Sequence, residues 1–128
     1  GLATLEAMQV GKPIIAVKTG GLTRQVVDHR DGTQNGIALE VDMQSLVGSQ
    51  AVPYIYEDYT HPEKIADAIY KMYSMGSEER EKLGQKARSY VLSEFSLQKT
   101  IDEWDKTLSN LVENYKENPS PRWTCEIV

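Results

Sequence analysis

Short apolar runs separated by turn residues dominate residues 1–41 and predict a helix, strand, helix, strand order. Near the start, apolar residues recur at helical spacing: Leu2, Leu5, Ala7 and Met8. Gly11 is typical of a helix end, and the apolar run 14–17 is typical of a strand covered on both faces of a parallel sheet. A short helix over 22–28 and a strand over 37–41 follow. This alternation favours an α/β fold with parallel strands.

The second half of the chain predicts helices that pack on this sheet. Pro62 begins the first of them, and one apolar stripe along it is expected to face the core: Ile65, Ala66, Ile69, Met72 and Tyr73. Ser77 is expected to cap the next helix. Its inward-facing residues are predicted to be Leu83, Ala87, Tyr90 and Val91. Both helices are therefore interpreted as scaffold.

A final long helix over residues 96–115 carries its apolar residues in a different rhythm. They are spaced alternately four and three apart: Leu97, Ile101, Trp104, Leu108, Leu111 and Tyr115. This repeat of roughly 3.5 residues gives one narrow seam, which must be buried against a partner. A coiled-coil dimer is one interpretation, although the seam is short for one. The polar, proline-broken stretch 116–128 is predicted to be a flexible tail.

The segment 43–60 is long for a simple connection and contains three tyrosines, Tyr54, Tyr56 and Tyr59. We expect an ordered surface loop that packs these rings against the rest of the protein. The alternative is a loop beside a ligand cleft, with one tyrosine stacked on a sugar or a base.

Composition excludes several classes of function. The net charge of -5 and the pI near 5.0 argue against binding to nucleic acid or to an anionic membrane surface. The single cysteine, Cys125, excludes an internal disulfide and a cysteine-rich metal site. No apolar run approaches the length of a membrane span, so we expect no integral membrane segment and a cytoplasmic protein.

Two polar features give only weak signals of catalysis or metal binding. His29 lies in a charged turn and is expected to be solvated, because acid–base catalysis requires an oriented partner. Glu40 and Asp42 are the nearest approach to an acidic metal-binding pair, but the chain contains no Asp-x-Asp motif. We therefore predict no metal.

The start of the first helix is the strongest candidate for a binding site. The N–H groups of its first residues lack partners within the helix and lie at the positive end of its dipole, which favours a phosphate. Those residues are Gly1, Leu2, Ala3 and Thr4. Glu6, one turn further in, would repel phosphate but can accept hydrogen bonds from sugar hydroxyls. Together they suit a nucleoside diphosphate, whereas the alternative is that Glu6 is an ordinary solvated helix residue.

The stretch from Gly1 to Gly21 resembles a signature of GT4-type glycosyltransferases of the GT-B fold. The shared features are a Leu-Glu-Ala helix, the Gly-Lys-Pro turn, a hydrophobic strand and a Gly-Gly loop. The similarity continues through Asp31-Gly32, the strand after Gly36 and the Phe95-Ser96 start of the last helix. It therefore covers most of the chain.

The resemblance implies a Rossmann-like, donor-binding half-domain over residues 1–115, whose final helix, 96–115, packs on an N-terminal acceptor domain. It implies that the backbone of Gly1, Leu2 and Ala3, the hydroxyl of Thr4 and the carboxylate of Glu6 bind a nucleoside-diphosphate sugar. Gly20 and Gly21 are possible loop contacts. The implied reaction is hexosyl transfer with retention, independent of metal and without a cofactor. No residue of this chain is assigned a catalytic role.

Two departures from the family pattern limit what this chain is expected to do alone. The first glutamate of the family motif would precede Gly1, as would the cations that neutralise the diphosphate, so Lys12, Lys18 and Arg24 are the nearest substitutes. We therefore expect the C-terminal piece of an enzyme, inactive by itself. The alternative is a non-catalytic nucleotide-binding or interaction module of the same descent.

Overall fold

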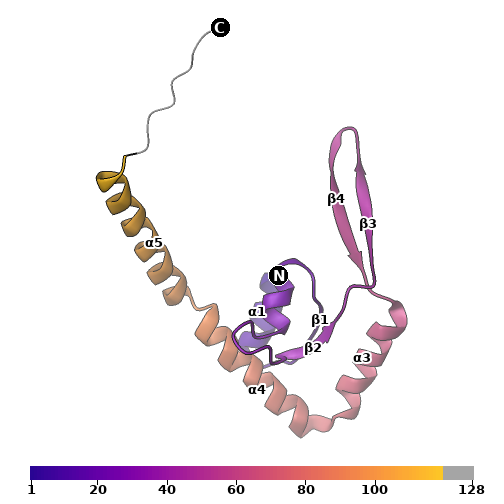
Figure 1. The fold of residues 1–128 in the computed structure, drawn as a ribbon. Helices are drawn as coiled ribbons and strands as arrows, with labels where there is room; N and C mark the ends of the chain where they lie inside the picture. Colours follow the sequence, from indigo (N-terminus) through magenta and orange to yellow (C-terminus); the bar gives the residue numbers. More distant parts are fainter. Residues whose placement is uncertain (120–128) are drawn as a thin grey trace. The chain divides into compact units, whose positions relative to one another are not determined.

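The computed structural model describes residues 1–119 (Figure 1). The chain divides into two compact units, Gly1–Phe95 and a second that begins at Ser96, and each is considered by itself. The first unit is a mixed α/β structure with a small parallel sheet, and the second contains a long helix. None of the helices in the described residues is long and apolar enough to cross a membrane.

The first unit begins with the predicted alternation of helices and strands. Its elements are α1 (Leu2–Gln9), β1 (Ile14–Val17), the 3-10 turn η1 (Gly20–Leu22), α2 (Thr23–Val26) and β2 (Gly36–Leu39). Gly11 ends α1 with a φ of 73°, a left-handed conformation that glycine adopts without strain. Strands β1 and β2 are parallel, as the sequence predicts.

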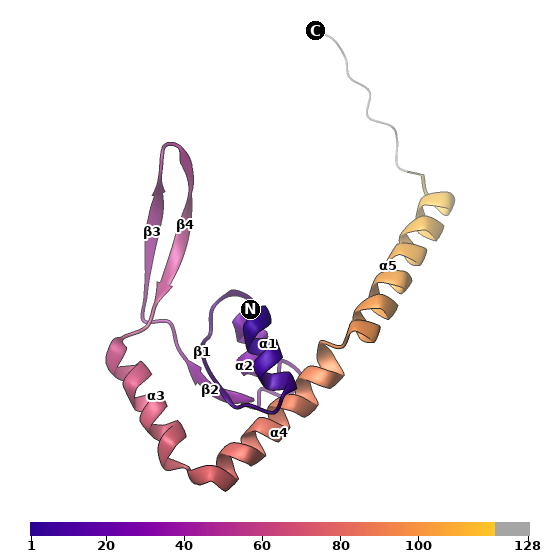
Figure 2. The same cartoon turned by 180° about the vertical axis from the view of Figure 1, so that it is seen from behind.

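Helices cover both faces of this two-stranded sheet, which explains the continuous apolar run in β1. Ile14 and Ala16 belong to a buried cluster with residues of α1, α2 and α4 (Gly76–Glu94). Ile15 and Val17 pack on a second cluster around Ala68 of α3 (Pro62–Ser74). Figures 1 and 2 show β1 and β2 side by side within these helices.

The predicted helix starts and stripes are correct in part. Pro62 occupies the first turn of α3 as predicted, but most of the expected stripe is exposed: Ile65, Ala66, Ile69 and Tyr73. Ala68 is buried instead, because a sheet of two strands covers only a narrow band of a helix. Ser77 lies within the first turn of α4, so its predicted cap is wrong. The inward face of α4 is confirmed at Ala87, Tyr90 and Val91.

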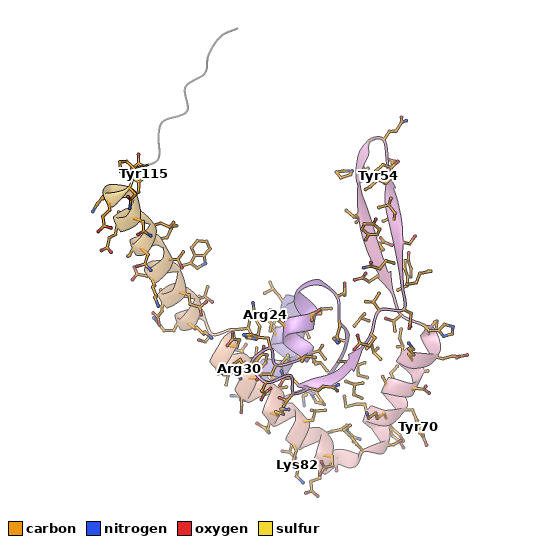
Figure 3. All side chains as sticks on the ribbon, viewed as in Figure 1. Arg24, Arg30, Tyr54, Tyr70, Lys82 and Tyr115 are labelled. Carbon is orange, nitrogen blue, oxygen red and sulfur yellow. The ribbon has the colours of Figure 1, made fainter. Side chains whose placement is uncertain are left out.

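The segment predicted to be a loop is a β-hairpin. Strands β3 (Met43–Ser49) and β4 (Val52–Tyr59) are antiparallel, with an irregularity between Val47 and Ser49. The prediction that the segment packs its tyrosines is also wrong, because Tyr54, Tyr56 and Tyr59 are all exposed. Figure 3 shows Tyr54 on this hairpin.

The second unit contains one helix, α5 (Leu97–Glu117), among its described residues. The Ser96 side chain accepts a hydrogen bond from the Lys99 backbone N–H at 3.2 Å and caps the helix. The whole predicted seam of α5 is exposed, including Trp104 at 62%. The helix continues two residues into the predicted tail, 116–128, and residues 120–128 lie outside the described residues.

A close backbone contact fixes α4 against the turn that follows α1. A Cβ atom placed on Gly84 of α4 would lie 2.0 Å from the carbonyl oxygen of Gly11 and 3.3 Å from Cδ of Pro13. Only glycine fits there without moving backbone. The residues around this contact include the buried cluster members Met8 and Ala87.

Gly84→Ala should therefore destabilise the first unit by about 1–3 kcal/mol, through forced separation of α4 from the turn after α1. An alanine in an exposed helix would instead stabilise it by roughly 0.5–1 kcal/mol relative to glycine. Urea unfolding followed by circular dichroism measures the difference, with the exposed Ser89→Ala of the same helix as control. A Gly84→Ala variant as stable as the parent would contradict the contact.

Candidate functional site

The N-terminal end of α1 has the features expected of an anion site. Gly1 is the N-cap residue, no side chain caps the helix, and no acidic residue lies in its first turn. Gly1, Leu2 and Ala3 are exposed, whereas Thr4 is half-buried. The partnerless N–H groups and the positive dipole end therefore face a region where an anion can approach.

The N-terminal end of α1 lies against the segment that follows Gly20 and Gly21. A Cβ atom on Gly1 would lie 2.7 Å from Cδ2 of Leu22, 3.1 Å from Oε1 of Gln25 and 3.2 Å from Oγ1 of Thr4. Position 1 therefore tolerates no side chain without a shift of its neighbours. Two segments that are separate in sequence meet at this point.

Gln25 is a residue of this site that the sequence analysis missed. It is only 6% exposed, and its Oε1 atom is buried without a hydrogen-bond partner among residues 1–119. An unsatisfied buried oxygen costs free energy unless a donor reaches it, and a ligand hydroxyl or a water molecule supplies one. The only sequence signal was a polar residue directly before the apolar pair Val26-Val27.

Asn35 contacts the backbone of Gln25. It is fully buried, its backbone N–H donates to the Val26 carbonyl at 2.8 Å, and its side-chain amide donates to the Gln25 carbonyl at 3.3 Å. Its own Oδ1 is likewise buried without a partner in the described part of the chain. These bonds tie the end of α2 to the start of β2.

Glu6 is exposed one turn inside α1, and the glycine pair is exposed in η1. Cβ atoms built on Gly20 and Gly21 would meet nothing within 4 Å, so neither glycine is required there by crowding. Gly20 has a φ of 47°, which does favour glycine. The structure therefore presents all the predicted donor-binding residues at accessible or half-buried positions.

Two of the three candidate cations pair with carboxylates, and the third follows the far end of α1. Lys18 Nζ lies 2.7 Å from Oε1 of Glu40, and the Arg24 guanidinium lies 3.7 Å from Oε1 of Glu94. Lys12 follows the opposite end of α1, about 12 Å along the helix axis from its start. It lines a hollow of about 510 Å³ together with Arg80 and Gln85.

An ion pair between the buried Asp28 and the exposed Arg30 stabilises the turn after α2. Asp28 is 5% exposed and accepts from the Arg30 guanidinium at 2.6 and 2.9 Å and from the Arg30 backbone N–H at 2.9 Å. The Arg30 guanidinium carbon also lies 5.0 Å from the centre of the Tyr90 ring. The hydrogen bonds to Arg30 outweigh desolvation and lower the pKa of Asp28 to about 2.

His29 is exposed, as the sequence predicts, but its ring also has hydrogen-bond partners that the sequence does not reveal. Its side chain is 34% exposed, and its Nδ1 lies 3.1 Å from the Tyr90 hydroxyl, which itself donates to the Arg24 carbonyl at 2.6 Å. Its Nε2 lies 3.1 Å from the Arg24 guanidinium, which can only donate. These contacts join the turn after α2 to α4. Its contacts are those of a structural connector.

The predicted acidic pair is also engaged by neighbouring groups. Glu40 pairs with Lys18, while Asp42 pairs with Lys64 and accepts the His61 backbone N–H at 2.8 Å. These bonds hold α3 to the end of β2 and lower the pKa of Asp42. The described residues contain no group of three or more His, Cys, Asp or Glu side chains that could hold a metal ion.

No protein-family model matches this chain, and no curated protein or solved structure is similar to it.

The Asp28–Arg30 pair should make stability depend on acid. Because the pKa of Asp28 is lower in the folded state, its stabilising effect is complete above about pH 4 and is lost as pH falls toward 2. Asp28→Asn should remove the part of the acid-induced loss of stability that this pair causes, and Arg30→Gln should remove the same part. Urea midpoints measured between pH 5 and pH 2 give the comparison. An Asp28→Asn variant with the parent's full acid sensitivity would show that the pair does not act this way.

Proposed function

We propose that this chain is the nucleotide-sugar-binding part of a GT4-type glycosyltransferase with a Rossmann-like domain of the GT-B fold. The observation that carries the proposal is that the buried Gln25 oxygen lies beside Gly1, at the uncapped N-terminus of α1. Glu6 is exposed one turn further along the same helix. The resemblance of the Gly1–Gly21 stretch to the family supports the same assignment.

In this proposal each group has one task. The first-turn N–H groups of α1 bind the donor diphosphate, and Glu6 accepts hydrogen bonds from the ribose hydroxyls. The hydroxyl of Thr4 lies at the edge of the phosphate site, and Gly20 and Gly21 border it. Gln25 gains the hydrogen-bond donor that it lacks when a hydroxyl or an ordered water enters.

The proposed reaction is transfer of a hexose with retention and without a metal. As the glycosidic bond breaks, negative charge develops on the leaving diphosphate. The helix dipole and its N–H groups stabilise that charge at a fixed position, which lowers the barrier without a proton-transfer residue in this chain. Lys18 and Arg24 pair with carboxylates, so additional cations would come from other parts of the enzyme.

The acceptor would bind outside this chain, on an N-terminal domain that packs on α5. The exposed seam of α5 supports this part of the proposal, since a helix with apolar residues along one line needs a partner to bury them. The same seam supports the second candidate function, a non-catalytic nucleotide-binding or interaction module of the same descent.

Binding of nucleoside diphosphates tests the proposal. Calorimetry with UDP, GDP and ADP, on this chain and on a version extended upstream, should detect binding of one nucleotide. Glu6→Gln should weaken it at least about tenfold, because a charged hydrogen bond to the ribose is lost. Glu63→Gln alters another exposed glutamate, in the first turn of α3, and should leave affinity unchanged.

The outcomes separate the candidate functions. Nucleotide binding that depends on Glu6, together with sugar transfer by the extended version, supports the enzyme. The same binding without transfer supports the non-catalytic module. A folded extended protein that binds none of the three nucleotides would contradict both.

A further inference from the structure

The β3–β4 hairpin exposes apolar side chains on both of its faces. Met43, Ile55 and Tyr59 lie on one face, and Leu46, Tyr54 and Tyr56 lie on the other. Tyr56 alone is 70% exposed. A two-stranded hairpin is at best marginally stable in water unless more strands or a helix join it. The exposed apolar residues of this two-stranded hairpin therefore favour the addition of further strands from a partner.

The two outer edges of the hairpin differ in how they are protected. Strand β4 contains Pro53, which has no N–H to donate, and the carboxylates of Glu57 and Asp58. Proline and charge are the features that block pairing at an edge. Strand β3, of sequence MQSLVGS, contains neither. Among residues 1–119 this sheet has two strands only, so the outer edge of β3 is not paired.

We propose that two copies of this chain associate through their β3 strands. The strands pair in antiparallel orientation about a twofold axis at Ser45 and form a four-stranded sheet. The proposal does not depend on the assigned enzymatic function, because it uses only the hairpin.

The hairpin's own register selects this centre. Within one chain Met43 pairs with Tyr59, Ser45 with Glu57, and Val47 with Ile55. With Ser45 opposite Ser45 of the second copy, Met43 lies opposite Val47 of that copy. Each outer row on this face then contains four apolar residues: Tyr59, Met43, Val47 and Ile55.

Neighbouring centres give poorer matches. A centre at Gln44 places Met43 opposite Ser45, and one at Leu46 places Ser45 opposite Val47. With the centre at Ser45 the two Glu57 carboxylates are separated by three strand spacings, about 14 Å, so they do not repel strongly. The paired stretch 43–47 also ends before the irregularity between Val47 and Ser49.

The same pairing explains why association would stop at two copies. After the β3 strands pair, both free edges of the four-stranded sheet are β4 strands. Their Pro53, Glu57 and Asp58 oppose further addition. The assembly is closed by its twofold symmetry, as in most homodimers.

Sedimentation equilibrium of the Cys125→Ser protein tests association, and directed cross-linking tests the register. The mass should rise from 14.4 kDa to about 29 kDa with concentration. Ser45→Cys in that background should form an intermolecular disulfide under mild oxidation. Opposed residues of antiparallel strands lie about 4.5–5.5 Å apart at Cα, within the reach of a disulfide.

Ser49→Cys is the matched control, since Ser49 is a serine at the other end of the same strand. In the proposed dimer the two copies of residue 49 lie about 26 Å apart and should not cross-link. Circular dichroism of both variants verifies that they fold as the parent does.

A dimer in which the Ser45→Cys variant cross-links and the Ser49→Cys variant does not supports the proposal. A monomer at all concentrations up to about 200 μM would overturn it, since a specific interface of useful strength associates below that range. A dimer in which the Ser49→Cys variant cross-links as fast as the Ser45→Cys variant would place the interface elsewhere, for instance on α5. Assemblies larger than a dimer would overturn the proposed closure.

Discussion

Helix α4 can lie against the turn after α1 only because residue 84 carries no side chain. The Gly84 backbone approaches the Gly11 carbonyl so closely that even a methyl group would overlap it. This approach lets Ala87, Tyr90 and Val91 of α4 form one buried cluster with Met8 of α1. The orientation of α1, and therefore the direction of its N-terminal N–H groups, follows from this contact.

A network of polar contacts also connects α2 and the turn after it to α4. Tyr90 of α4 donates to the Arg24 carbonyl, stacks edge-on against Phe95 and lies beneath the Arg30 guanidinium. Asp28 in turn holds Arg30 from the turn after α2. Because these groups connect α2 to α4, they also set the position of the α2 residue Gln25 beside the start of α1. Burial and the charge of Asp28 raise the pKa of Tyr90.

Local patterns predicted those parts of the fold that depend on local chemistry. The apolar run 14–17, the glycine at position 11 and the proline at position 62 each gave the correct element, because turn and strand preferences act within a few residues. The hairpin was missed because its strands mix apolar and polar residues on both faces. The stripe of α3 was misjudged because burial depends on how many strands lie beneath a helix, which periodicity does not reveal.

In the candidate site, too, the sequence predicted features that depend on local chemistry and missed those that depend on long-range packing. The start of α1 and Glu6 could be proposed from spacing, since helix ends have fixed electrostatics. Gln25, Asn35 and the partners of His29 could not, because long-range packing decides which polar groups are buried together. The Asp28–Arg30 pair was within reach of sequence reasoning, as an aspartate that accepts the backbone N–H two residues on is a common turn.

We propose that a nucleoside diphosphate binds where α1 begins, beside Gln25. Nuclear magnetic resonance with ¹⁵N-labelled protein, titrated with UDP, GDP and ADP in turn, tests it residue by residue. We expect one nucleotide to shift the backbone signals of Leu2, Ala3, Thr4 and Glu6 and the side-chain amide signal of Gln25. Shifts confined to other parts of the protein, or none with any of the three nucleotides, would contradict it.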